Sequence, residues 1–168
     1  MIVDVLHFSF TVSDIERSVT WYTERLGLEL VHRQRQESVY TGTLVGMAGA
    51  VLEIARLDIP GRPPGPSGHL LELIQYVRPE GVVIPLLTNS PGVAHLAFIV
   101  DDIHERYERM RHASVEFRNP PVYITAGTNT GGWACYCSGP DGETLELLQL
   151  PPRGPEPSAV IRGGDLDD

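Results

Sequence analysis

The sequence predicts an α+β fold: two tandem βαβββ modules that form a curled sheet around one shared cavity. The first observation behind this prediction is a phrase that occurs twice, His7-Phe8-Ser9-Phe10-Thr11-Val12-Ser13-Asp14-Ile15 and His95-Leu96-Ala97-Phe98-Ile99-Val100-Asp101-Asp102-Ile103. The second is a shorter repeated phrase, Leu71-Glu72-Leu73-Ile74-Gln75 and Leu145-Glu146-Leu147-Leu148-Gln149. Each half therefore opens on a strand that carries a His and closes on a strand that carries a Glu.

The first module is predicted at residues 1–78. Residues 3–12 alternate between apolar and mixed positions, which indicates a strand, and Ser13-Asp14 caps a helix that ends at Gly27. Strands are predicted at 28–36, 51–55 and 69–77. Glycines punctuate residues 37–49, so we expect a loop there that could include a short helix, and prolines and glycines predict a loop at 58–68.

Residues 79–92 are predicted to link the modules, because Pro79, Gly81, Pro85 and Pro91 interrupt any regular element. The second module, at 93–151, repeats the order with strands at 93–100, 115–117, 133–137 and 143–150 and a helix from residue 103. Residues 119–132 are expected to be a loop that covers an opening. Residues 152–168 have little to bury and are predicted to be a disordered tail.

The charge and composition limit the classes of partner that the chain is expected to bind. The 168 residues carry a net charge of −9, which argues against nucleic acid or an anionic membrane, since both attract basic proteins. The N-terminus shows no signal-peptide pattern, and no apolar run reaches the ~18 residues that span a bilayer. Cys135 and Cys137 are two apart, so on a strand they lie about 7 Å apart, too far for an unstrained disulfide. We therefore expect two buried thiols and a cytoplasmic location. The expected partner is a small-molecule substrate.

Strand alternation directs four side chains to one kind of surface. His7, Glu72, His95 and Glu146 each lie between two apolar residues, and those neighbours favour the side of the sheet that the helices cover. A carboxylate in the middle of an apolar strand is costly unless it is paired or bound to a metal. The alternative is four solvent-facing polar residues. The duplicated pattern favours a metal site with two His and two Glu ligands, which suits one divalent Fe, Mn, Co, Ni or Zn ion.

These modules and motifs resemble the vicinal oxygen chelate superfamily over about residues 3–150. That superfamily includes glyoxalase I, methylmalonyl-CoA epimerase, extradiol dioxygenases and bleomycin-binding proteins. The resemblance implies metal ligands on the first and last strand of each module, and His7, Glu72, His95 and Glu146 match those positions. The set of two His and two Glu is similar to that of bacterial glyoxalase I, whereas the epimerase usually carries Gln at the position of Glu72.

The resemblance implies proton transfer next to a carbonyl through a metal-stabilised enediolate, on a small substrate with two adjacent oxygens. Glu53 falls at the position of the epimerase family's catalytic glutamate, so Glu53 and Glu146 are the expected acid–base residues; a solvent-exposed carboxylate is the alternative for Glu53. Strand 51–55 is interpreted with Leu52 and Ile54 toward the helix, which places Glu53 on the opposite side. Residues that could line the cavity are Tyr76, Tyr123, Asn129 and Trp133.

Two other functions stay open at this point. An Fe(II)-dependent dioxygenase uses the same scaffold, although a fourth protein ligand fits its two-His, one-carboxylate triad poorly. A non-catalytic small-molecule binding or resistance protein would lack the metal residues. The resemblance also implies a homodimer, in which the ligands of one site could come from one chain or from two.

Overall fold

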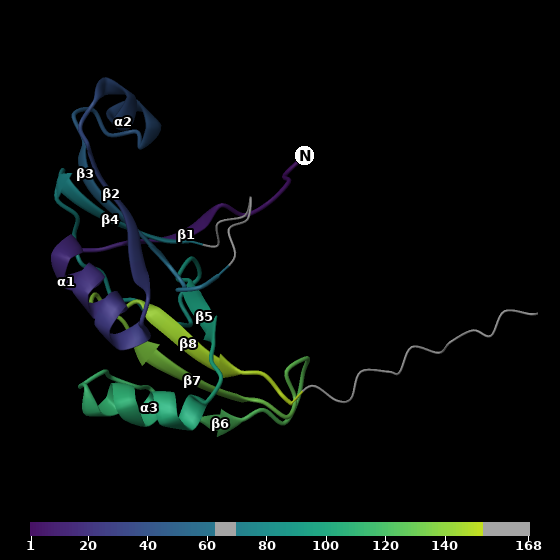
Figure 1. Cartoon of the computed structure of the whole chain (residues 1–168). Helices are drawn as coiled ribbons and strands as arrows, with labels where there is room; N and C mark the ends of the chain where they lie inside the picture. The colour runs from purple at the N-terminus through teal and green to yellow at the C-terminus, as the bar shows by residue number, and fades with distance from the viewer. Residues whose placement is uncertain (63–69, 153–168) are drawn as a thin grey trace, which may run out of the picture.

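The computed structural model describes residues 1–62 and 70–152, and it contains two four-stranded sheets (Figure 1). The first half contains β1 (His7–Thr11), α1 (Ile15–Trp21), a π-helical turn η1 (Tyr22–Leu26), β2 (Glu29–Gln36), α2 (Val39–Leu44), β3 (Val51–Asp58) and β4 (Leu70–Arg78). The second contains β5 (His95–Ile99), α3 (Ile103–His112), β6 (Val122–Tyr123), β7 (Trp133–Ser138) and β8 (Thr144–Gln149). The α+β fold of tandem βαβββ modules is confirmed.

Both sheets have the same topology. The strand order is β1-β4-β3-β2 in the first and β5-β8-β7-β6 in the second, with the first strand parallel to the last in each module. The final Gln of the repeated phrase explains part of this likeness. The side chain of Gln75 accepts the backbone N–H of Ile15 at 3.0 Å, and that of Gln149 accepts the N–H of Ile103 at 2.9 Å. Each Gln thus ties the closing strand to the start of its module's helix.

Helix ends follow the predicted signals. The carboxylate of Asp14 accepts the N–H of Arg17, and that of Asp102 accepts the N–H of Glu105. Gly27 ends the first helix with φ at +75°, a conformation that costs glycine little. The short helix that residues 37–49 could include is present as α2.

One strand was predicted in the wrong place. Val115 is buried in the core, but the expected strand at 115–117 makes only an isolated bridge between Phe117 and Cys137. Pro120 and Pro121 lack the N–H that a ladder requires, so regular pairing resumes only at β6, inside the segment predicted as a loop. Residues 153–168 of the tail predicted at 152–168, residues 63–68 of the predicted loop and His69 of the predicted strand lie outside the described residues.

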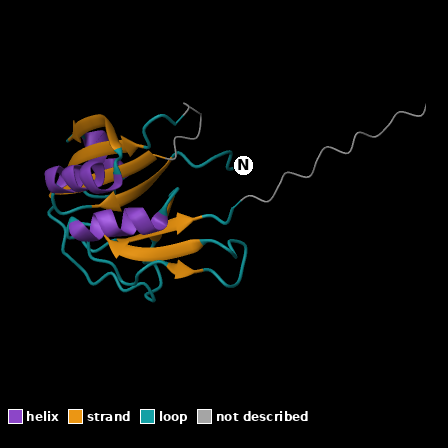
Figure 2. Ribbon diagram, turned by 60° about the horizontal axis from the view of Figure 1, so that its bottom comes forward, coloured by secondary structure: helices purple, strands orange, loops and turns teal. Residues whose placement is uncertain are grey.

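A single hydrophobic core joins the two modules. It combines Ile15 and Tyr22 of the first helix with Ile103 and Met110 of α3, together with strand residues from both sheets. Figure 2 shows the strands in two separate groups with helices between them. We call the side of each sheet that packs into this core the inner face, and the opposite side the outer face. Within the described residues, no helix is long and apolar enough to cross a bilayer.

Polar contacts also hold the modules together. The buried Tyr22 hydroxyl donates to Glu143 at 2.7 Å, and the Ser13 hydroxyl and N–H donate to Asp141. Burial, then the Glu143 charge, raises the pKa of Tyr22. Partial burial raises the pKa of Asp141, but hydrogen bonds from Ser13 and Arg17 hold it below its ordinary value. The turn at 139–142 and the adjacent Glu143 thus attach the second module to the first helix and its cap.

The two cysteines are buried free thiols on the inner face, as predicted. Burial raises the pKa of Cys135 to about 11 and that of Cys137 to about 12, so both thiols stay protonated at neutral pH.

Candidate metal centre

The first candidate pair lies on the outer face of the first sheet. His7 on β1 is opposite Leu70 on β4, which places Glu72 two residues further along the same face. The Nε2 atom of His7 is 3.5 Å from Oε1 of Glu72, and the Glu72 residue is only 6% exposed. The other ring nitrogen of His7, Nδ1, is buried with no hydrogen-bond partner among the described residues. The polar neighbour of this imidazole is therefore the carboxylate that the sequence paired with it.

The second sheet repeats this arrangement with the same strand offset. His95 on β5 is opposite Thr144, and Glu146 follows two residues later on β8. Nε2 of His95 is 3.3 Å from Oε2 of Glu146. Both N–O separations are close to the roughly 3 Å that adjacent ligands of a divalent ion span when each bond is about 2.1 Å. Imidazole nitrogens and carboxylate oxygens are also suitable donors, so the two pairs fit a divalent metal.

The chain by itself does not unite the two pairs. Within residues 1–62 and 70–152, no group of three or more His, Cys, Asp or Glu side chains is placed to hold a metal ion. The physical reason is the shared core: the sheets turn their inner faces toward each other, so the outer faces with the His–Glu pairs point away. Of the two arrangements left open by the sequence, ligands from one chain or from two, the described residues therefore do not favour the one within a single chain.

Two residues beside the carboxylates were missed by the sequence reasoning. Arg56 on β3 is directly opposite Glu72, and its Nε donates to Oε2 of Glu72 at 2.7 Å. Tyr136 on β7 occupies the corresponding place opposite Glu146. Partial burial, followed by the charge of Glu146 and a hydrogen bond to it, raises the pKa of Tyr136. No repeated motif marks either residue, because only the register of the strand pairs brings them to the carboxylates.

Glu53 lies on the inner face, not on the face of Glu72. It is opposite Gln75, whose side chain reaches the start of α1, and its neighbour Ala55 is opposite the core residue Leu73. Its carboxylate accepts from Nη1 of Arg35 at 2.7 Å. The interpretation that Leu52 and Ile54 face the helix is wrong. The strand is apolar on both faces, so alternation alone does not reveal which face meets the core.

Glu53→Gln should therefore leave turnover within about twofold of the wild type, because the side chain has no path to a substrate beside Glu72. The exposed pair with Arg35 contributes little, so the melting temperature should also change little. Steady-state kinetics on the substrate found for the wild type checks this. A loss of turnover by 100-fold or more, with the fold intact, would restore Glu53 as the base.

The four residues proposed to line the cavity do not lie on one face of the structure. Tyr76 lies on the outer face with Glu72, since it is two positions beyond Ile74 on the same strand and opposite Leu52. Trp133 is opposite Gln149 on the inner side and stacks edge-on with His104 of α3 at 4.7 Å, and Tyr123 is paired with Trp133. The expectation for Tyr123 and Trp133 is thus wrong. Asn129 lies in the loop between β6 and β7, where its carbonyl accepts the N–H of Gly132.

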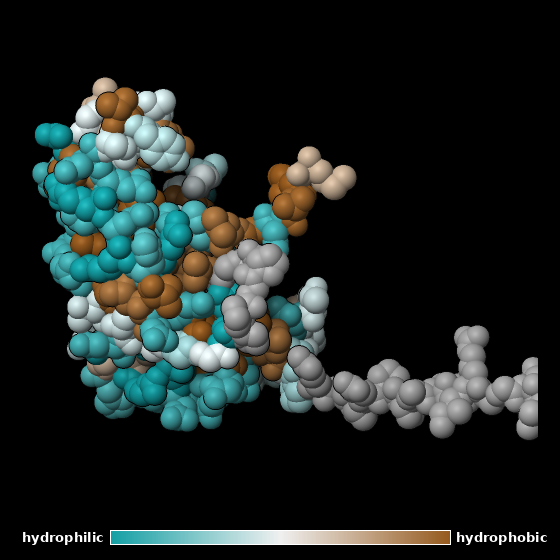
Figure 3. Space-filling model, turned by 45° about the horizontal axis from the view of Figure 1, so that its top comes forward, coloured by the Kyte–Doolittle hydropathy of each residue, from teal (hydrophilic) through white to brown (hydrophobic). Residues whose placement is uncertain are grey.

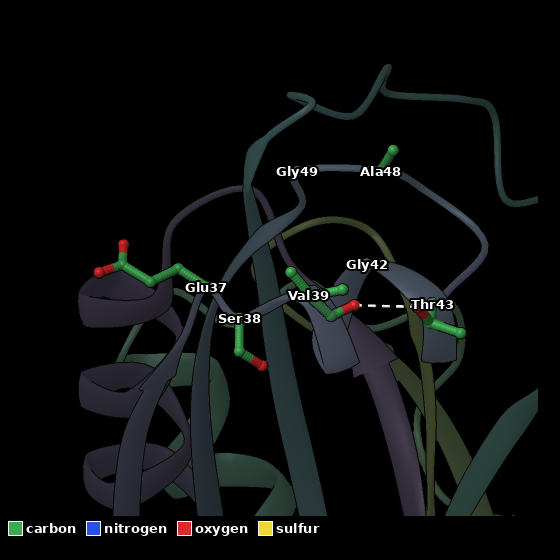
Figure 4. Close-up of a pocket in the computed structure, with 7 residues that line it drawn as sticks. All are labelled: Glu37, Ser38, Val39, Gly42, Thr43, Ala48 and Gly49. Atoms are coloured by element: carbon green, nitrogen blue, oxygen red, sulfur yellow. Dashed lines mark hydrogen bonds between the residues drawn. The ribbon is translucent and has the colours of Figure 1, made fainter.

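Two pockets among the described residues lie away from the His–Glu pairs. One pocket of about 360 Å³ lies beside α2 and is lined by Glu37, Ser38, Val39, Gly42, Thr43, Ala48 and Gly49 (Figure 4). Its visible hydrogen bond, from the Thr43 hydroxyl to the Val39 carbonyl, only continues the helix. A second pocket, of about 290 Å³, lies between the modules and includes Leu28, Phe98 and Arg106. The His–Glu pairs lie outside both.

Comparison with known proteins identifies the family. Residues 4–147 match the Glyoxalase/Bleomycin resistance protein/Dioxygenase superfamily. The chain belongs to this superfamily. A glyoxalase family protein from Bacillus cereus has a similar structure, with a TM-score of 0.73 and 21% identity over 90% of this chain and 96% of that one. At that identity the likeness describes the glyoxalase fold alone.

Two curated relatives within the superfamily have named activities. A 2-epi-5-epi-valiolone epimerase from Actinomyces sp is 32% identical over 157 residues, which cover 91% of this chain and 82% of that protein. A lactoylglutathione lyase from Arabidopsis thaliana is 27% identical over 96% of this chain and 50% of its own length. The chain thus spans about half the length of this plant lyase. Isomerases and lyases are both represented among its relatives.

Proposed function

We propose that this member of the glyoxalase superfamily is a metal-dependent isomerase that moves a proton next to a carbonyl group of a small substrate with two adjacent oxygens. The observation that carries the proposal is the equal geometry of the His7–Glu72 and His95–Glu146 pairs. Each pair sits at the same strand offset on an outer face.

An isomerase is favoured over a lyase by the extent of the likeness. The epimerase relative is similar over most of its own length, whereas the plant lyase is matched over half. We therefore expect a hydroxylated ketone or a related carbonyl compound as the substrate class. The lyase remains the second candidate, because the ligand set of two His and two Glu is the one that resembles bacterial glyoxalase I.

The residues of the site would have three roles: to bind the metal, to transfer the proton and to contact the substrate. His7, Glu72, His95 and Glu146 would hold a divalent Fe, Mn, Co, Ni or Zn ion. Such an ion, when bound, polarises the substrate carbonyl and stabilises negative charge on its oxygen. Glu146 is the proposed proton carrier, since its side chain is more exposed than that of Glu72, 17% against 7%. Tyr76 is placed on the same outer face as Glu72, where it can contact a substrate.

We propose that a second copy of the chain completes each site. The outer faces of one chain point away from each other, so His7 and Glu72 of one protomer need His95 and Glu146 of its partner. β1 and β5 are the end strands of their sheets, and large apolar side chains are exposed beside them, Val3, Val5, Leu6 and Ile99. Figure 3 shows apolar side chains on the projecting N-terminal segment. Such surface is typical of an interface.

The test combines metal analysis with isotope exchange. Protein purified from metal-replete medium should carry one divalent ion per His7–Glu72/His95–Glu146 site. Incubation with hydroxyketone substrates in D₂O should place deuterium at the carbon next to the carbonyl, without consumption of oxygen. Oxygen consumption that stops when iron is removed would support a dioxygenase instead. A protein that binds no metal would contradict the proposal and favour a small-molecule binder.

A further inference from the structure

The two outer faces differ at the residue opposite the carboxylate. The His, the Glu and their strand offset are the same in both sheets. The position opposite Glu72 is Arg56, however, and the position opposite Glu146 is Tyr136. A cation therefore faces one carboxylate and a neutral phenol faces the other. The difference is confined to this neighbour, because the His–Glu offset is the same in both sheets.

The contact with Arg56 uses one particular oxygen of Glu72. Nε of Arg56 donates to Oε2 at 2.7 Å, while Oε1 is the atom that faces Nε2 of His7, at 3.5 Å. A charge-assisted hydrogen bond of this length is strong, and the Glu72 side chain is only 7% exposed. The two carboxylate oxygens thus have separate partners. Oε2 is committed to the guanidinium, and Oε1 is the oxygen left for any ligand beside His7.

We infer that Arg56 is a positioning residue that limits Glu72 to a single metal-binding oxygen and so keeps room for two oxygens of the substrate. This inference rests on the proposed function. If the ion took six ligands, two imidazoles and two single carboxylate oxygens would leave two positions for the substrate. If Glu72 bound through both oxygens, one position would remain, and a substrate with adjacent oxygens would lose half of its attachment.

Tyr136 does not impose the same limit on Glu146. The phenol is neutral and its ring lies 5.6 Å from the ring of His95, edge-on. The Glu146 side chain is also the more exposed of the two carboxylates. The asymmetry therefore assigns Glu72 a fixed position and leaves Glu146 freer to move, which agrees with its proposed role as the proton carrier.

The test compares two probes that differ only in the number of donor atoms. Co²⁺-loaded protein would be titrated with acetohydroxamate, which offers two adjacent oxygens, and with azide, which binds through one atom. Binding is followed by the visible spectrum of the cobalt ion. Arg56→Met should weaken acetohydroxamate about tenfold or more and leave azide within about twofold. Arg56→Lys, which keeps a cationic donor, should restore much of the loss.

Tyr136→Phe is the matched control, since it alters the corresponding position of the other sheet and should not change the ratio of the two affinities. If Arg56→Met fails to fold, Arg56→Gln, with a neutral donor of similar length, should give a smaller loss of the same kind. Unchanged acetohydroxamate binding in the folded variant, or an equal loss of both probes, would overturn the inference. A wild-type protein that binds no Co²⁺ would instead defeat the proposed function itself.

Discussion

Glu146→Gln should reduce turnover by about 10²–10⁴-fold, the range typical of losing a general acid–base group. The carboxylate lies on an outer face, 3.3 Å from Nε2 of His95, and it is hydrogen-bonded to a neutral phenol rather than to a cation. Glutamine keeps the shape and one oxygen donor but accepts no proton. Metal content should therefore fall much less than turnover. The rate of deuterium incorporation, measured beside metal content, separates the two effects.

Glu53→Gln is the matched control for that variant, because it makes the same chemical change on the inner face of the other sheet. It should retain both turnover and metal. Equal activity of the two variants would remove Glu146 from proton transfer. A Glu146→Gln protein without metal would show that this residue acts as a ligand first, and the loss of turnover would then say nothing of its role as a base.

The duplicated phrases predicted much of the fold and of the candidate site. They placed a His on the opening strand and a Glu on the closing strand of each half, and the structure pairs these strands and shows each His and Glu at the same offset. This succeeded because the residues that flank each Glu, Leu71 and Leu73 on β4 and Leu145 and Leu147 on β8, pack into the core and so turn the carboxylates to the outer face. The Gln that closes each phrase had no role in the prediction, yet it fixes the start of its module's helix.

Glu53 shows where the alternation of apolar residues no longer predicts which face of a strand meets the core. On β3 both faces are largely buried, since Ala55 and Leu57 enter the core and Leu52 and Ile54 lie on the other side. A period of two then fits either orientation, and a choice between them reverses every side chain. Only the pairing with β4 decides it. The same limit hid Arg56, because only its register opposite β4 brings it to Glu72.

Local sequence patterns also could not predict how the two modules are placed relative to each other. It depends on long-range contacts such as Tyr22 with Glu143 and Ser13 with Asp141. Gly139 is needed at this position, because a Cβ there would overlap the carboxylate of Glu143. Gly139-Pro140-Asp141-Gly142 is typical of a turn. Its use as the attachment between modules, which turns the two outer faces apart, follows from packing alone.

His7→Ala and His95→Ala should each abolish turnover as homodimers, because every shared site then lacks one imidazole. A heterodimer of the two variants should regain activity. One of its sites loses both histidines, while the other combines the intact His95 of one protomer with the intact His7 of its partner. With one complete site of two, we expect about half of the wild-type activity. Coexpression with two different affinity tags isolates this heterodimer.

The reciprocal heterodimer makes the test decisive. A wild-type protomer paired with a His7→Ala/His95→Ala double variant has one damaged ligand in each shared site, so it should be inactive. Turnover of these two purified heterodimers is the most direct measurement of whether the metal site is built from two chains. About half activity in the first and none in the second is the predicted result. The reverse result would place both His–Glu pairs of a site in one chain and contradict the account.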